Sequence, residues 1–122
     1  MKNVTVIISC YNEIKFVEGC LNNLKKLRKT TCPGLKVIVK NQGSTDGSRE
    51  GIEDAYPWVR LINGENDGLS KAYNMCYKAA DTEYLLFLGM DAFPEAGTLS
   101  GITEYLDKNQ EIGAATCRLV LR

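Results

Sequence analysis

Short apolar runs alternate with amphipathic stretches along this chain, and that alternation constrains its fold more than any other feature. Residues 4–8 are apolar and rich in β-branched side chains, which is typical of a strand buried on both faces. Residues 14–29 follow, with apolar side chains at helical spacing. The pattern then repeats, and the predicted order is βαβαβαβαβ. The further expected strands are residues 35–39, 58–62, 83–88 and 112–121, and the further expected helices are a short one ending near Tyr56, residues 69–80 and residues 96–108.

Strands that alternate with helices predict an α/β fold with a mostly parallel sheet covered on both faces. Right-handed crossovers make such a domain doubly wound. The 122 residues suit a single domain that can bury a core of its own. In sheets of this kind, ligands bind beyond the carboxyl ends of the strands, where the strand order reverses. We therefore expect function in the loops that follow the strands.

Polar, glycine-rich and acidic residues gather in those loops. Residues 9–13 follow the first expected strand, 41–48 the second, 65–68 the third, and Asp91 the fourth. We call this set of residues the carboxyl edge. The loops expected at the opposite edge are ordinary connections by comparison. The sequence thus predicts that one edge of the sheet carries the site.

Composition excludes several classes of function. Lys and Arg together number 15, as do Asp and Glu, so the net charge is zero and no nucleic-acid partner is expected. The chain has no histidine, which excludes histidine-based catalytic triads and zinc sites. Its five cysteines form no CxxC pair, and we expect them to be reduced and mostly buried in a cytoplasmic protein. Neither a signal peptide nor a membrane span is expected.

Several residues of the carboxyl edge, and two on the helix expected at residues 69–80, each have a structural and a functional interpretation. Asp46 is a good helix cap and the neighbouring glycines permit tight turns, but a helix N-terminus also suits an anion. Lys71 and Asn74 share a helix face, where the lysine is either solvated or faces an anion. Asp91 is either a turn residue or a ligand for a cation or sugar. Tyr11 is either a stacking platform for a base or an aromatic residue at the edge of the core.

Four segments, in order, resemble motifs of the family 2 glycosyltransferases of the GT-A fold. They read VTVIISCYNE at residues 4–13, VIVKNQGSTDGS at 37–48, ENDGLSKAYN at 65–74 and EYLLFLGMD at 83–91. The last is similar to a family segment that ends in D-x-D. Each motif is weak alone, but their order and spacing cover essentially the whole chain.

This resemblance implies a chain that binds a nucleotide-diphosphate sugar, with a UDP-sugar expected first. It implies transfer with inversion to a hydroxyl of a carbohydrate or lipid-linked acceptor, in polysaccharide or glycoconjugate synthesis. Tyr11 and Glu13 would lie against the nucleoside, Asn41 would face the base edge, and Asp91 would hold Mn²⁺ or Mg²⁺ against the pyrophosphate. The nucleotide-sugar-binding residues that it implies are Ser9, Tyr11, Glu13, Asn41, Gly43, Ser44, Lys71 and Asn74.

Departures from the family pattern concern the donor site. Asn41 stands where the family usually has Asp, and Gly89 stands where the first acid of D-x-D would be. Both changes weaken the expected binding of donor and metal. Tyr73 also replaces a common Arg, and Ser9 and Cys10 replace Pro and Thr.

No general base is identifiable in the chain, and we expect the base beyond Arg122. Residues 1–122 would then be one GT-A-like nucleotide-sugar-binding domain, truncated before the acceptor-binding half. The alternative is a non-catalytic GT-A-like interaction module with a decayed donor site. Apolar surface left exposed by a missing half would suit a homodimer or another partner. The expected location is cytoplasmic, at the inner face of a membrane if further segments or partners anchor the chain there.

Overall fold

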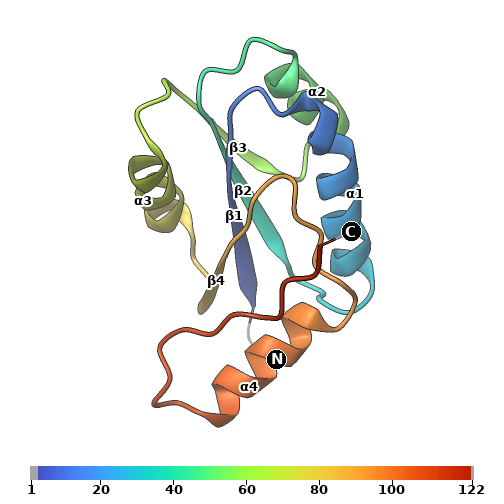
Figure 1. Cartoon of the computed structure of the whole chain (residues 1–122), viewed down its shortest axis with the longest axis vertical. Coiled ribbons are helices and arrows are strands. Elements are labelled where there is room, and N and C mark those ends of the chain that lie inside the picture. The colour runs from blue at the N-terminus through green and yellow to red at the C-terminus, as the bar shows by residue number, and fades with distance from the viewer. Residues whose placement is uncertain (1–2, 122) are drawn as a thin grey trace.

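The computed structural model describes residues 3–121, in which strands and helices alternate (Figure 1). The elements are β1 (Val4–Cys10), α1 (Ile14–Lys29), β2 (Lys36–Asn41), α2 (Ser48–Ala55), β3 (Arg60–Asn63), α3 (Leu69–Ala79), β4 (Tyr84–Phe87) and α4 (Thr98–Lys108). The first eight predicted elements are therefore confirmed, with ends that differ by up to two residues. The helix expected from residue 96 begins after Gly97, whose φ of 86° lies in the left-handed region.

All four strands are parallel, and their order in the sheet is β3-β2-β1-β4. Cys10 pairs in register with Asn41, and Asn41 pairs with Asn63, so the carboxyl ends of β1, β2 and β3 are level. The chain moves from β1 to β3 in one direction and then returns to place β4 on the free side of β1. The strand order thus reverses at β1, between the loops that follow β1 and β4.

Helices cover both faces of the sheet, so the doubly wound α/β prediction is confirmed. Alternate residues of a strand point to opposite faces, and the two faces have separate cores. Figure 1 shows α1 and α2 on one side of the sheet and α3 on the other. The larger core includes Val6, Ile8, Val37 and Val39 of the sheet with Leu21 and Leu24 of α1 and Ile52 of α2, and the smaller one joins Ile7 and Ile38 to Cys76 of α3.

The prediction of a fifth strand at residues 112–121 is wrong. This segment is irregular and exposed except at Ile112. Leu119, Val120 and Leu121 are 82%, 65% and 92% exposed. Within residues 3–121 β4 pairs only with β1, so its other edge is open, but residues 112–121 do not pair with it. Ile112 and residues 114–116 instead lie beside α4, where they line a cavity with residues of that helix. The local apolar pattern contained no information about this alternative.

All five cysteines are free thiols, four of them buried and Cys117 exposed, in agreement with the prediction of mostly buried thiols.

None of the helices in residues 3–121 is both long enough and apolar enough to span a bilayer.

Candidate functional site

The loops after β1 and β2 are fastened to each other at the carboxyl edge. The backbone N–H of Asn12 donates to Oγ of Ser44 at 3.0 Å, and the N–H of Thr45 donates to Oδ1 of Asn12 at 2.7 Å. Asn12 has a φ of 51°, a left-handed conformation that Asn tolerates better than most residues. The two loops therefore form one surface. Asn12 was not among the predicted site residues, although it lies inside the first motif.

Asp46 joins the N-termini of two helices. Its Oδ2 accepts the backbone N–H of Ile14 at 3.0 Å, and its Oδ1 accepts the N–H of Ser48 at 3.0 Å and also the Ser48 hydroxyl. Ile14 begins α1 and Ser48 begins α2, and the flanking residues Glu13 and Gly47 supply no capping side chain. The hydrogen bonds, first of all the one from the Ser48 side chain, hold the pKa of Asp46 below its usual value. The capping interpretation is confirmed, for two helices at once.

Replacing Asp46 with Ala is expected to lower the melting temperature by several degrees near neutral pH, since two helix N-termini lose an acceptor. The folded-state pKa of Asp46 is lowered, so its contribution exists above the unfolded-state pKa and disappears as the pH falls through the folded value. The difference between Asp46→Ala and the unchanged chain should therefore shrink toward about pH 3. Thermal unfolding followed by circular dichroism checks this, and a difference that stays constant with pH would contradict it.

Asn41 is committed to hydrogen bonds inside the site. Its side chain, at the end of β2, is 2% exposed. Nδ2 donates to Oδ1 of Asn63 at 3.0 Å, and Oδ1 accepts the N–H of Ser44 at 3.2 Å. Asn63 is the exposed member of this pair. A ligand at the edge would therefore meet Asn63, a residue that the sequence reasoning missed because its partner lies 22 positions away.

Glu13 lies at the reversal of strand order, within electrostatic range of Asp91. Burial raises the pKa of the half-buried Glu13, and the negative charges of Asp91 and Asp46 raise it further, against a backbone hydrogen bond from Tyr11 that lowers it. Glu13, in the loop after β1, thus lies in electrostatic range of Asp46 in the loop after β2 and of Asp91 in the loop after β4. Asp91 itself is exposed.

The carboxylate of Asp91 folds back over Gly89. A Cβ placed at Gly89 would lie 2.8 Å from Oδ1 of Asp91, and the N–H of Ala92 closes a turn on the carbonyl of Gly89 at 3.1 Å. Asp91 therefore fills the space that a side chain at position 89 would need. An exposed carboxylate can rotate out of that space, so the crowding does not forbid a second acid there.

The residues present fit a divalent ion that shares its coordination with a substrate. Within residues 3–121, no three His, Cys, Asp or Glu side chains are grouped closely enough to hold a metal on their own. Mn²⁺ and Mg²⁺, however, bind in many sites through one or two carboxylates plus phosphate oxygens and water. Asp91 supplies one such carboxylate, and the charge of Glu13 lies nearby.

The remaining predicted residues lie on β1, in the loops after β1 and β2, and on α3. Ser9 is half-buried near the end of β1, and Tyr11, just beyond, is 50% exposed. Gly43 turns with a φ of 77° beside the carbonyl of Gly64. On the other face of the sheet, Lys71 and Asn74 are exposed on α3. Lys71 pairs with Asp67 at 2.8 Å, which raises the pKa of the lysine and lowers that of the aspartate.

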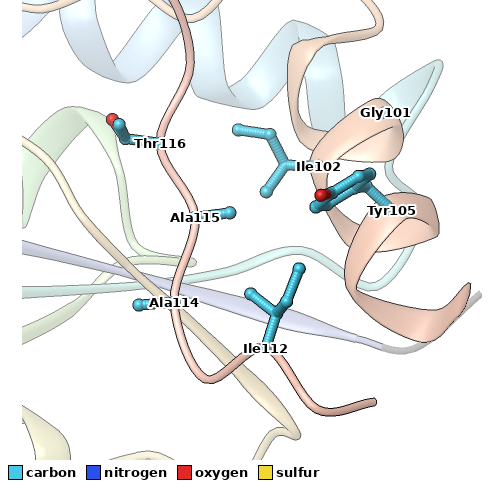
Figure 2. A pocket seen from close by; sticks show the side chains of 7 residues that line it. All are labelled: Gly101, Ile102, Tyr105, Ile112, Ala114, Ala115 and Thr116. Carbon is cyan, nitrogen blue, oxygen red and sulfur yellow. The ribbon is translucent and has the colours of Figure 1, made fainter. Parts of the chain in front are cut away.

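A cavity of about 490 Å³ lies elsewhere, between α4 and the segment that follows it (Figure 2). The hydroxyl of Tyr84, at the start of β4, donates to Asp107 of α4 at 2.6 Å, which places α4 by the amino ends of the strands. The cavity contains none of the predicted site residues and no charged side chain. Its lining residues are Gly101, Ile102, Tyr105, Ile112, Ala114, Ala115 and Thr116.

Comparison with known protein families identifies a match over nearly the whole chain. The sequence profile described as "Glycosyl transferase family 2" matches residues 5–120. The chain is 34% identical over 113 residues to the teichoic acid poly(glycerol phosphate) polymerase of Staphylococcus epidermidis, covering 88% of this chain and 15% of that protein. It is 34% identical over 110 residues to the uncharacterized glycosyltransferase EpsJ of Bacillus subtilis, covering 88% of this chain and 31% of that one. The chain thus spans less than a third of the length of either relative.

Solved structures share the fold. The mannosyltransferase PcManGT of Pyrobaculum calidifontis, in complex with GDP-Man and Mn²⁺, superposes with a TM-score of 0.74 at 28% identity, over 86% of this chain and 32% of that one. S. aureus TarS in complex with UDP-GlcNAc superposes with a TM-score of 0.73 at 25% identity, over 88% of this chain and 32% of that one.

Proposed function

The chain belongs to glycosyl transferase family 2 and has the GT-A fold, and we propose that its carboxyl edge binds a nucleotide-diphosphate sugar for transfer to an acceptor hydroxyl. One observation carries the proposal: the loops after β1 and β2 are hydrogen-bonded to each other at the reversal of strand order, where Asp91 after β4 lies in electrostatic range of Glu13. Ligands of parallel α/β sheets bind at such a reversal. The complexes of PcManGT with GDP-Man and of TarS with UDP-GlcNAc support this ligand class.

Each element of the edge has a distinct task in this proposal. Tyr11 offers an exposed ring on which a base can stack, and Asn63 offers an exposed amide to polar atoms of the nucleoside. Asp46 and Asn12 hold the two loops in place, so that little order has to be gained when the ligand binds. A UDP-sugar remains the first candidate among nucleotide sugars.

Asp91 would hold Mn²⁺ or Mg²⁺ by rotating its carboxylate away from Gly89 toward the diphosphate. The ion would neutralise the charge that develops on the leaving diphosphate. Glu13 adds a second negative charge on that side of the site. The pKa of Glu13 is raised in the free chain, and a bound cation would lower it again because a nearby positive charge favours the ionised form.

In the proposed reaction, the acceptor oxygen forms a bond to the anomeric carbon as the bond to the diphosphate oxygen breaks. A general base takes the proton of the acceptor hydroxyl, and the diphosphate leaves with the electron pair. Glu104 pairs with Lys108, and Asp107 accepts the hydroxyl of Tyr84 by the amino ends of the strands. Neither carboxylate lies at the carboxyl edge, and we assign the base to neither. The acceptor would be a carbohydrate or a lipid-linked sugar.

Calorimetric titration of UDP, GDP and dTDP into the chain, with Mn²⁺ or with EDTA, tests the proposal. We expect one diphosphate to bind with Mn²⁺ and to bind more weakly with EDTA. Gly89→Asp should raise the Mn²⁺-dependent affinity several-fold because it adds a second carboxylate beside Asp91. Gly89→Asn is the matched control, with the same size and no charge, and it should give a smaller gain.

If none of the three diphosphates binds to a sample shown to be folded, the proposal is contradicted. That result would favour the non-catalytic interaction module instead. That alternative is supported by the exposed apolar side chains of Leu119, Val120 and Leu121, which a partner could cover.

A further inference from the structure

Lys40 is a buried lysine on β2, with only 1% of its surface exposed. It follows Ile38 by two residues and so points to the face of the sheet that α3 covers. Lysine is almost never fully buried unless it is paired. The hydrogen bonds of its ammonium group go to Oε1 of Gln42 at 2.6 Å and to the carbonyl oxygen of Glu65 at 2.9 Å. Both acceptors are neutral, so neither hydrogen bond is an ion pair. Burying the ammonium group of Lys40 therefore costs free energy that these two bonds do not fully offset.

Residues at the end of β2 form several hydrogen bonds with the loop of residues 63–68, and one of these is the bond from Lys40 to Glu65. Nε2 of Gln42 donates to the carbonyl of Gly68 at 3.0 Å, and the N–H of Gly64 donates to the carbonyl of Asn41 at 3.1 Å. Gln42 therefore links the ammonium of Lys40 to the far end of the loop. We call residues 40–42 the β2 clamp.

Gly64 makes room for the ammonium. A Cβ at this position would lie 3.0 Å from Nζ of Lys40 and 3.2 Å from its Cε. Both contacts are tighter than ordinary van der Waals distances, so a side chain here would press on the lysine. The glycine and the lysine thus depend on each other, although 24 positions separate them.

The loop of residues 63–68 runs directly into the first turn of α3. Gly68 is the residue before α3, and Lys71 follows it within that turn. The charge of Lys40 also reaches Asp67: the hydrogen bond from Lys71 is the main cause that lowers the pKa of this aspartate, and Lys40 adds to it. The buried ammonium therefore acts on both the backbone and the charge of the loop.

We infer that Lys40 is a positioning residue, which acts through the β2 clamp to hold the loop of residues 63–68 at the carboxyl edge in the conformation that accepts a nucleotide diphosphate. The inference rests on the proposed function for the identity of the ligand. It assigns to Lys40 no contact with that ligand. Through this loop, Lys40 would fix the positions of Asn63 and of the start of α3 before the ligand binds.

Two variants test the role from different directions. Lys40→Met keeps the length of the side chain but removes the charge and the donors, and Gly64→Ala keeps the charge but pushes on the ammonium. Lys36→Met is the matched control, because Lys36 lies on the same strand but is exposed and pairs with Asp81 at 2.8 Å at the other end of β2. The readouts are hydrogen–deuterium exchange of the free chain and calorimetric titration with UDP and Mn²⁺.

For Lys40→Met and Gly64→Ala, amide exchange in residues 63–71 should become about tenfold faster while exchange in β1 and α1 stays unchanged. The affinity for UDP should fall about tenfold, because the loop must be ordered on binding. Lys36→Met should change neither readout. If Lys40→Met does not fold, Gly64→Ala decides the question alone.

Unchanged exchange in residues 63–71 would overturn the inference, whether or not any nucleotide binds. So would faster exchange together with an unchanged affinity for UDP, in a chain that binds UDP before substitution. Failure of the unsubstituted chain to bind any nucleotide diphosphate would instead overturn the proposed function. In that case the exchange data still decide whether Lys40 holds the loop.

Discussion

Replacing Asp91 with Asn is expected to abolish the part of nucleotide-diphosphate binding that depends on Mn²⁺. Asp91 is the exposed acid that follows β4, and we propose that its carboxylate binds the ion. Glu13 is the acid in electrostatic range of Asp91 that adds negative charge to this site. Loss of a residue that merely orients a metal ligand costs about 10–100-fold in metal affinity. Loss of the ligand itself should cost at least as much. The affinity for UDP in Mn²⁺ should therefore fall to the value measured in EDTA.

The melting temperature should not fall in Asp91→Asn, because an exposed side chain contributes little to stability. Glu83→Gln is a suitable control, since Glu83 is also an exposed acid next to β4 but lies at its amino end. This variant should bind UDP like the unchanged chain. Undiminished Mn²⁺-dependent binding by Asp91→Asn would show that the ion is held elsewhere.

Replacing Leu24 with Ala is expected to lower the free energy of unfolding by about 2–5 kcal/mol. Leu24 lies on α1, is fully buried, and belongs to the core between α1 and the sheet. Its truncation removes buried apolar surface and leaves a cavity. Domains of this kind have a total stability of about 5–15 kcal/mol, so the loss is a large share of it.

Urea unfolding followed by circular dichroism measures this loss. Lys25→Ala changes the neighbouring exposed residue of the same helix and should stay within about 0.5 kcal/mol of the unchanged chain. A loss below about 1 kcal/mol for Leu24→Ala would mean that the packing of α1 on the sheet is looser than described here.

Local sequence patterns were enough to predict the elements from β1 to α4. Residues 4–8 are all β-branched, residues 35–39 are apolar except for Lys36, and α1 carries apolar residues at helical spacing, so each pattern pointed to one structure. Residues 112–121 carry a comparable apolar pattern but form no strand. A local apolar pattern shows that a segment is able to form a strand but not whether it joins the sheet, and within residues 3–121 the outer edge of β4 stays unpaired.

The sequence predicted where the candidate site lies in the fold, but not which residues hydrogen-bond or pack against one another there. The rule that ligands bind beyond the carboxyl ends of parallel strands led to Glu13 and Asp91 before their proximity was visible. The bond from Ile14 to Asp46 joins residues 32 positions apart, and the burial of Lys40 depends on a glycine 24 positions away. Such pairs arise only when the sheet brings distant loops together.

Amide NMR shifts of the isotope-labelled chain during titration with UDP and Mg²⁺ test most directly whether the carboxyl edge binds a nucleotide diphosphate. We expect the shifts to concentrate at Tyr11, Ser44, Asn63 and Asp91, while Cys32 and Asp81 at the opposite edge stay unchanged. Shifts confined to the opposite edge or to the cavity beside α4 would contradict it. So would the absence of any shift at millimolar nucleotide in a folded sample.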